Sequence, residues 1–171
     1  TANSYNDSVS FFYGENLIED KVISVGPKPN DLLMHDYKVY VICGESNSMV
    51  IYDLKEDKSI GEVATESWPH SIDMDFNNKL LFVSNLESDS ITVISMDNYD
   101  TVENIQVPEY PTKIRVSNDK KRIYICCSYL GKDKRGYIDV INIGNFQKIA
   151  RVMVGYSPID MIEDDDNIYV S

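Results

Sequence analysis

KLLFVSNLESDSITVIS (79–95) is the stretch that decides the fold, because the chain repeats it at a spacing of about 42 residues. Two other copies are KVYVICGESNSMVIYDL (38–54) and RIYICCSYLGKDKRGYIDVIN (122–142). A fourth copy is divided: NIYVS (167–171) ends the chain, and TANSYNDSVSFFYG (1–14) reads as its continuation. Repetition at this period predicts an architecture of similar units that bury their apolar faces against one another.

Aromatic residues and prolines mark fixed positions in each unit. The aromatic positions, separated by 42, 42 and 45 residues, are Tyr40, Phe82, Tyr124 and Tyr169. The proline positions, separated by 40, 42 and 47 residues, are Pro29, Pro69, Pro111 and Pro158. Proline has no N–H and a fixed φ, so it belongs in connections or at strand starts. Each proline therefore marks the entry to a unit.

One unit contains four short strands, expected at 71–76, 80–84, 90–95 and 101–107. In the first of these, Ile72 and Met74 alternate with Asp73 and Asp75, the period-two pattern of a half-buried strand. The pair Asn77-Asn78 supplies a turn. No window keeps the apolar periodicity of a helix. The pattern predicts an all-β fold: a β-propeller of four-stranded antiparallel blades, with about four repeat units in this chain.

Four short motifs carry a resemblance to a known family: FVSN (82–85), YICC (124–127), YVIC (40–43) and YVS (169–171). They resemble the YVTN motif of YVTN-family β-propellers, as do the polar loop and the S-[IVM]-x-V-[IF] run that follow. Cys43 and Cys127 replace the motif's asparagine, and Asn85 keeps it. The resemblance implies a propeller of usually about seven blades and a bacterial protein, with cell surface and periplasm among the family's locations. It implies no particular activity.

The units run roughly over 25–64, 65–106 and 107–153, with a split unit formed by 154–171 plus 1–24. Together they form a single propeller domain or a propeller segment. Two arrangements fit: the chain's ends complete one blade and close a four-bladed ring, or the chain is part of a larger ring. The second leaves two sheet edges open. It would need a homo-oligomer or a partner chain to complete the ring.

Charge and cysteine content limit which binding partners and which cellular compartment we expect for this protein. The formal net charge is −12, so we expect no nucleic-acid binding. No apolar stretch approaches the roughly 18 residues of a membrane span, and the start TANSYNDSVS shows no signal peptide. Cys126 and Cys127 are adjacent on a strand and point to opposite faces, so they do not pair. Reduced thiols favour the cytoplasm, while a cell-surface or secreted protein would have lost a signal peptide.

The prolines are expected to ring one mouth of the central channel. Aromatic, basic and polar residues beside them form a candidate site for a small molecule or a peptide: Lys28, Asn30, Trp68, His70, Tyr110, Tyr156 and Asp160. The competing interpretation, which a repeated position favours, is that Trp68, Tyr110 and Tyr156 pack between blades.

An insertion at 131–135 lengthens the third unit and breaks the symmetry of the repeat. Its basic residues form a candidate partner-binding loop: Lys132, Lys134 and Arg135. Insertions in repeat proteins map to loops, often on the binding face. The competing interpretation is a loop that only adds solubility.

No catalytic constellation stands out. His35 and His70 occupy different places in the repeat, so we expect no metal site, and no motif indicates a cofactor. The main hypothesis is therefore a non-enzymatic scaffold or binding module. A lactonase-like hydrolase or a dehydrogenase subunit is the second, and its candidate residues are His70, Asp31, Asp73 and Asp160. A repeat protein of a surface or coat assembly is the third.

Overall fold

The computed structural model describes residues 1–129, 133–164 and 167–171. The described residues form strands and turns only, as the period-two patterns predict. Three complete sheets of four antiparallel strands follow one another along the chain. The first contains β4 (Pro29–His35), β5 (Lys38–Cys43), β6 (Ser48–Asp53) and β7 (Lys58–Ala64). The second contains β8 (Pro69–Asp75), β9 (Leu80–Asn85), β10 (Ser90–Ser95) and β11 (Thr101–Gln106). The third contains β12 (Pro111–Val116), β13 (Arg122–Cys127), β14 (Arg135–Asn142) and β15 (Lys148–Tyr156).

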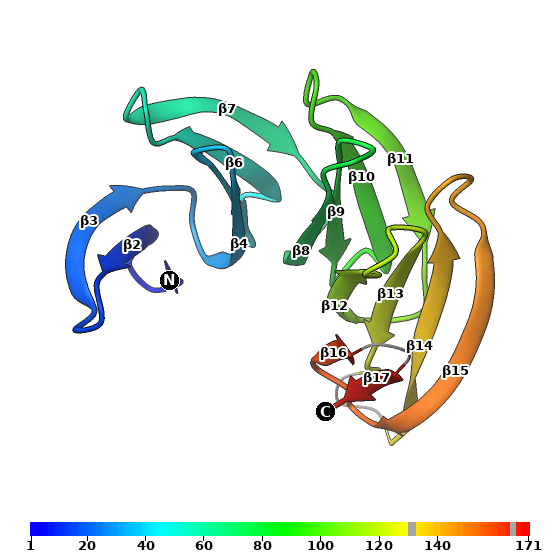
Figure 1. Ribbon diagram of the computed structural model, residues 1–171. Helices are drawn as coiled ribbons and strands as arrows, with labels where there is room; N and C mark the ends of the chain where they lie inside the picture. Colours follow the sequence, from blue (N-terminus) through cyan, green and yellow to red (C-terminus); the bar gives the residue numbers. More distant parts are fainter. Residues whose placement is uncertain (130–132, 165–166) are drawn as a thin grey trace.

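Two smaller sheets lie at the ends of the chain. The N-terminal sheet contains β1 (Ala2–Asn3), β2 (Ser8–Tyr13) and β3 (Ile18–Ser24), and the C-terminal sheet contains β16 (Met161–Asp164) and β17 (Asn167–Val170). By register, the N-terminal sheet supplies the outer strands of a blade, and the C-terminal sheet supplies its two inner strands. The inner strands β4, β8 and β12 neighbour one another, so the sheets fan around a common side (Figure 1). The expected β-propeller fold is confirmed.

Each inner strand of the complete blades begins at its landmark proline, slightly before the expected start in the second unit. Pro69 pairs with Asn85, and the register then shifts by a bulge before Ser71. Proline fits the first position of a strand because no ladder bond from its nitrogen is needed there. The bulge brings the chain from the connecting loop into the sheet.

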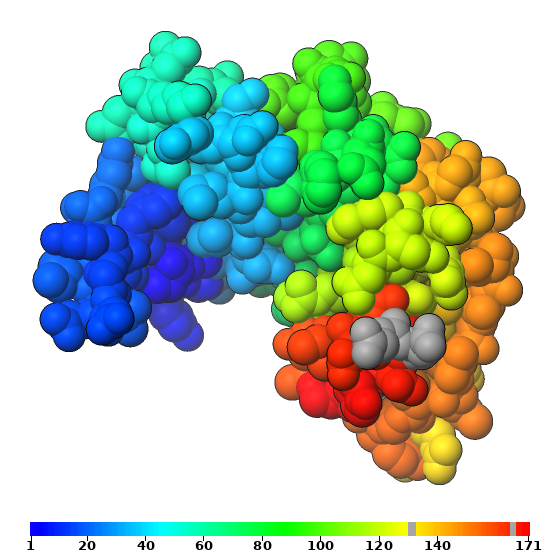
Figure 2. All heavy atoms as spheres, in the orientation of Figure 1, coloured from blue at the N-terminus to red at the C-terminus, as the bar shows by residue number. Residues whose placement is uncertain are grey.

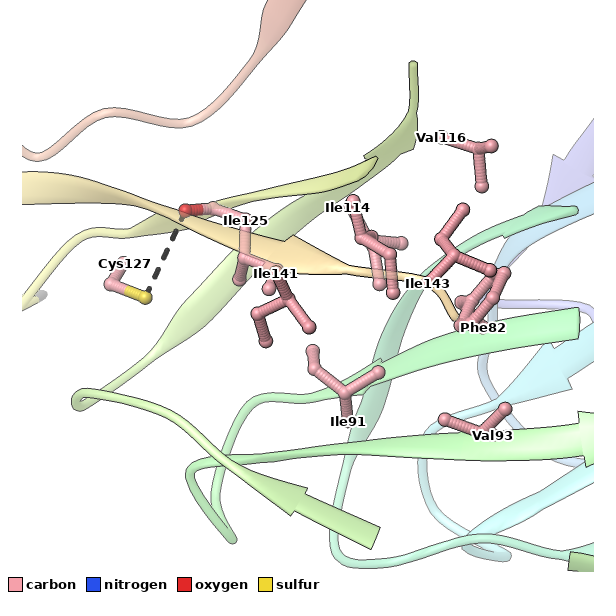
Figure 3. Packing of buried hydrophobic residues seen from close by; sticks show 10 residues of the cluster. Phe82, Ile91, Val93, Ile114, Val116, Ile125, Cys127, Ile141 and Ile143 are labelled. Carbon is pink, nitrogen blue, oxygen red and sulfur yellow. Dashed lines mark hydrogen bonds between the residues drawn. The ribbon is translucent and has the colours of Figure 1, made fainter. Parts of the chain in front are cut away.

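The core lies between neighbouring blades. Figure 3 shows the cluster between the second and third complete blades, where Phe82, Ile91 and Val93 face the third blade's inner strands. The third blade contributes Ile114, Ile125 and Ile141, among others. Burying one such side chain contributes about 1.5–3 kcal/mol. Because each blade buries its faces against the next, contacts between blades stabilise the fold.

The chain forms an open arc, so the closed four-bladed arrangement is wrong. Strands β17 and β2 belong to separate sheets in the part of the chain that the structure describes. Figures 1 and 2 show the two ends apart, with an open gap between them. The first half of the β2 edge is already occupied: Asn3 pairs with Ser8, and the Thr1 ammonium donates to the Ser10 carbonyl at 2.8 Å.

The three cysteines are free and buried, as predicted from their register. Cys43 and Cys127 take the position that Asn85 holds in the second complete blade. Burial raises the pKa of the Cys43 thiol to about 11 and that of Cys126 to about 12. Both therefore stay protonated at neutral pH and behave as small apolar residues.

Candidate functional site

The loop before each inner strand lies beside the loop that follows the second strand, as expected for one face of a propeller. Backbone hydrogen bonds join these loops: the N–H groups of Gly44, Leu86 and Ser128 donate to the carbonyls of Lys28, Trp68 and Tyr110. The distances are 2.8, 2.8 and 3.0 Å. The repeat thus places three of the predicted site residues at equivalent points of this face.

These three residues share an unusual backbone conformation. Their φ angles are 52° for Lys28, 56° for Trp68 and 57° for Tyr110. An acceptor from the preceding unit holds each N–H: Asp7 for Lys28, Asn47 for Trp68 and Asp89 for Tyr110, at 2.8–2.9 Å. A non-glycine residue with positive φ costs about 1–3 kcal/mol unless its surroundings fix it. These hydrogen bonds hold the positive-φ conformation, so the backbones of the residues before the prolines have a structural role.

The residues after the prolines join neighbouring blades. The Asn30 amide donates to the Pro69 carbonyl at 2.7 Å, and the His70 Nδ1 lies 2.8 Å from the Thr112 carbonyl. A carbonyl only accepts, so His70 Nδ1 carries the proton in this contact. The Thr112 hydroxyl donates to the Pro158 carbonyl at 2.9 Å in the same way. Asn30 and His70 therefore act as links between blades.

The carboxylates considered for an enzyme are also engaged between or within blades. Asp31 accepts bonds from the Ser71 hydroxyl and the Ile72 N–H, and the Lys113 ammonium lies 3.5 Å from it. Asp73 accepts the Val116 N–H of the next blade at 2.8 Å. Asp160 accepts the neighbouring N–H of Met161 at the start of the C-terminal hairpin. Within the described ranges, no cluster of three or more His, Cys, Asp or Glu is arranged to hold a metal ion.

Lys28 and Trp68 come together at the loop face. The Lys28 ammonium lies 5.5 Å from the centre of the Trp68 ring and 3.2 Å from a Glu45 carboxylate oxygen. Tyr110 lies instead beside acidic residues, in a hollow of ≈ 460 Å³ that Glu87, Asp89 and Glu109 also line. The predicted channel-mouth residues therefore divide between a cation–π contact and an acidic hollow.

The structure brings Tyr156 together with the inserted loop rather than with Trp68 and Tyr110. Tyr156 ends the outer strand β15 and pairs with Arg135. Ser157 occupies the position before the proline, with φ 47°. Tyr156, Lys134 and Arg135 line one cleft of ≈ 500 Å³. Lys132, the third predicted residue of the loop, lies outside the described residues.

Three further residues, which the sequence patterns did not indicate, complete this cleft: Tyr129, Tyr137 and Met153. Tyr129 and Tyr137 flank the insertion, which is the signal that could have indicated them. Met153 is brought in by the register, because it pairs with Tyr137 across β14 and β15. We call these six residues the tyrosine cleft.

The walls of the tyrosine cleft are held by ring–ring and cation–π contacts. Tyr129 and Tyr137 meet edge to face with ring centres 5.9 Å apart. The Lys134 ammonium lies 5.4 Å from the Tyr129 ring centre, and the Arg151 guanidinium lies 5.4 Å from that of Tyr137. Such contacts orient rings and cations together. Burial raises the pKa of the Tyr129 phenol, which therefore stays neutral at physiological pH.

Two cations of the cleft have no acidic partner in the part of the chain that the structure describes. Arg151 is satisfied, since it donates two bonds to Asp139 at 2.6 and 2.8 Å. Lys134 and Arg135 form no ion pair with another described residue, and both are exposed. The cleft thus presents tyrosine rings and positive charge on a chain with net charge −12.

The described residues contain no helix long and apolar enough to span a membrane.

Comparison with known proteins shows the fold alone. No family model matches the sequence, and no curated protein is similar to it. Among solved structures, the chain is similar to hydrazine synthase from Kuenenia stuttgartiensis, with TM-score 0.84 and 19% identity over 94% of this chain and 47% of that one. It is also similar to a putative 6-phosphogluconolactonase from Bacteroides uniformis, with TM-score 0.80 and 14% identity over 99% of this chain and 59% of that one. The chain thus spans about half the length of these neighbours, whose structures agree with a β-propeller arrangement.

Proposed function

We propose that the chain is a non-enzymatic binding module of the β-propeller type, which recognises a short acidic segment of a partner in the tyrosine cleft. The observation that carries the proposal is the convergence of Lys134, Arg135 and Tyr156 in one cleft. The insertion that breaks the repeat supplies two of the three. A feature absent from the other units is not needed to build a blade, so a role in recognition accounts for it.

The chemistry of the cleft favours an acidic segment with an apolar or aromatic side chain. Lys134 and Arg135 offer charge-assisted hydrogen bonds to carboxylates. Tyr129, Tyr137 and Tyr156 offer ring faces and hydroxyls, as in other recognition surfaces. A long polyanion would meet the repulsion of a chain with net charge −12, whereas a short segment would meet mainly the local cations.

The enzyme alternative has less support from the contacts. One solved neighbour is described as a putative 6-phosphogluconolactonase, but at 14% identity the likeness concerns the fold alone. His70 and Asp73, two residues that such an activity would use, each hold a main-chain group of the neighbouring blade. A binding role needs neither of them.

A peptide-binding experiment tests the proposal. Fluorescence anisotropy would compare a labelled pool of twelve-residue peptides rich in Asp, Glu and Tyr with a pool in which Lys replaces the acids. We expect the protein to bind the acidic pool only. The double change Lys134→Ala with Arg135→Ala should weaken this binding about tenfold or more, which corresponds to a loss of roughly 1.4 kcal/mol or more in binding free energy. Tyr156→Ala should weaken it as well.

Lys55→Ala with Lys58→Ala is the matched control, because it removes two positive charges from the exposed β6–β7 hairpin. This variant should bind like the unchanged protein. Equal losses in both double variants would mean that only the net charge matters. Absence of binding to the acidic pool at any salt concentration would overturn the proposal.

A further inference from the structure

A second pocket lies between the first and second complete blades, at the ends of the inner strands far from the prolines. Its volume is ≈ 220 Å³. Sites for drug-sized ligands have roughly 300–1,000 Å³, so this pocket fits only a small molecule or ion. Both blades are complete, and neither end of the chain lines the pocket. We call it the His–Lys pocket, formed by His35, Lys38 and Tyr40 of the first blade and by Phe76, Lys79 and Met96 of the second.

The first blade places two basic side chains next to each other at this pocket. A two-residue turn joins β4 to β5, with φ 47° and 62° at residues 36 and 37, and His35 pairs with Lys38 across it. Paired residues of a hairpin lie on the same face, with Cβ atoms roughly 5 Å apart. In the second blade, Asp75 takes the place of His35, where it is buried and accepts N–H groups of its own four-residue turn. A two-residue turn with positive φ needs no such acceptor, so the turn itself does not require His35 or Lys38.

The Lys38 ammonium keeps hydrogen-bonding capacity for a ligand. It donates to the Tyr99 hydroxyl of the second blade at 2.9 Å, and an ammonium has three N–H donors. This hydrogen bond raises the pKa of Lys38, so the ammonium stays charged. Lys38 forms no ion pair with another described residue, although the chain has 28 Asp and Glu against 16 Lys and Arg. Lys38 is thus a partly buried cation without a carboxylate of its own.

The Phe76 ring gathers further basic groups beside this cation. The rings of His35 and Phe76 are stacked, with centres 5.8 Å apart and an interplanar angle of 21°. The Lys120 ammonium of the third blade lies 5.7 Å from the Phe76 ring centre. Such contacts fix the ring and the basic side chains relative to each other. The local charge is therefore more positive than the net charge of −12 suggests.

Two acidic side chains also line the pocket, and both extend toward solvent. The Asp97 side chain is 65% exposed and lies 2.7 Å from the Lys79 ammonium. The Asp36 side chain is 87% exposed and lies 3.4 Å from the His35 Nε2. Water screens exposed pairs, so they hold their partners weakly. A ligand that enters the pocket meets Lys38 without a competing carboxylate.

We infer that the His–Lys pocket binds a small oxyanion, such as a phosphate or sulfate group. Lys38 supplies charge-assisted hydrogen bonds, because lysine binds such groups as a point charge. His35, across the hairpin from Lys38, supplies a second donor. Lys38 and Lys79 would repel a cation, and the volume excludes a large ligand. The site shares no residue with the tyrosine cleft and goes beyond the acidic segment proposed there.

An NMR titration of the isotope-labelled chain with inorganic sulfate and inorganic phosphate tests the inference. Sodium chloride keeps the ionic strength constant. We expect saturable shifts in the amide signals of residues 35–38 and 96–97, with Kd of about 1–10 mM. Methyl phosphate in a third titration separates a phosphate monoester from the free ion. Tighter binding than that of inorganic phosphate would assign the monoester, and weaker binding would assign the free ion.

Three variants assign the binding to Lys38. Lys38→Met should weaken it at least about tenfold, because the change removes the ammonium and keeps the apolar stem. Tyr99→Phe removes the other partner of the 2.9 Å bond and should change Kd by less than about twofold. Lys55→Met is the matched control: the Lys55 ammonium lies 4.2 Å from the Tyr37 ring centre beside the same turn, yet Lys55 does not line the pocket. This variant should bind like the unchanged protein.

The variants also separate a ligand site from a contact that only joins the blades. If the Lys38–Tyr99 bond were only structural, Lys38→Met and Tyr99→Phe would lower stability toward urea equally and leave oxyanion binding the same. That result would overturn the inference. Signals that move without saturation up to about 100 mM, or equal losses of binding in Lys38→Met and Lys55→Met, would overturn it as well.

Discussion

Within a blade, polar residues on the second and third strands form hydrogen bonds to each other. Where the second strand carries asparagine, the third carries a hydroxyl: the Asn85 amide donates to Thr92 at 2.9 Å, and the Asn3 amide donates to Ser10 at 2.9 Å. Asp139 holds the Thr92 position in the third complete blade, where Cys127 replaces the asparagine of the second strand. It is buried and satisfied by Arg151, directly across on β15.

This pair, in which Asp139 is buried and Arg151 is partly exposed, gives a prediction for Arg151→Met. The change leaves the Asp139 carboxylate buried, with the Lys148 ammonium at 3.8 Å as its remaining ion-pair partner among the described residues. We expect a loss of roughly 1–3 kcal/mol in the free energy of unfolding, measured by urea denaturation, because the change leaves a buried carboxylate without its main hydrogen-bond partner. Adding Asp139→Asn to the Arg151→Met variant should restore part of the lost free energy of unfolding. Lys58→Met, which breaks an exposed pair with Glu56, should cost less than about 1 kcal/mol. Equal losses for Arg151→Met and Lys58→Met would contradict this account.

Among the strands, β14 shows how one element limits the choice of residue. Ser48 and Ser90 begin the third strand of the first two complete blades, and Tyr137 takes that place in the third, directly after Gly136. A Cβ on Gly136 would lie 2.3 Å from Pro158 Cδ and 2.7 Å from the Cys127 carbonyl. The landmark proline of the next unit therefore packs directly on the backbone of β14.

The close packing predicts that Gly136→Ala destabilises the fold by about 2 kcal/mol, since strands or proline must shift to make room. Gly155→Ala is the matched control in the neighbouring strand, because a Cβ there meets nothing within 4 Å. Thermal unfolding of both variants would check the difference. The account fails if the two changes cost the same.

Across the whole molecule, the blades differ in how many of their faces are covered. The second complete blade has a blade on each side, with buried clusters against both. The N-terminal and C-terminal sheets each have one covered face, and exposed apolar residues such as Phe12 and Tyr169 mark the other. Local stability follows buried apolar contact, so the arc should be most stable in its middle.

Hydrogen exchange followed by mass spectrometry would measure this gradient. Amides of β9 and β10 should exchange slowest, and amides of β2, β3, β16 and β17 fastest, with opening free energies lower by more than about 1 kcal/mol. Uniform protection along the chain would contradict the gradient.

The amino-acid sequence alone predicts the repeat, the blade strands and the positions of the prolines, because these depend on local alternation and on proline's missing N–H. It also placed the three cysteines as free, buried residues. Lys134, Arg135 and Tyr156 were identified singly. The tertiary structure brings them into one cleft with Tyr129, Tyr137 and Met153, because the pairing of β14 with β15 joins segments about 20 residues apart. It also shows an open arc, with Thr1–Asn3 lying along Ser8–Ser10 and β17 in a separate sheet.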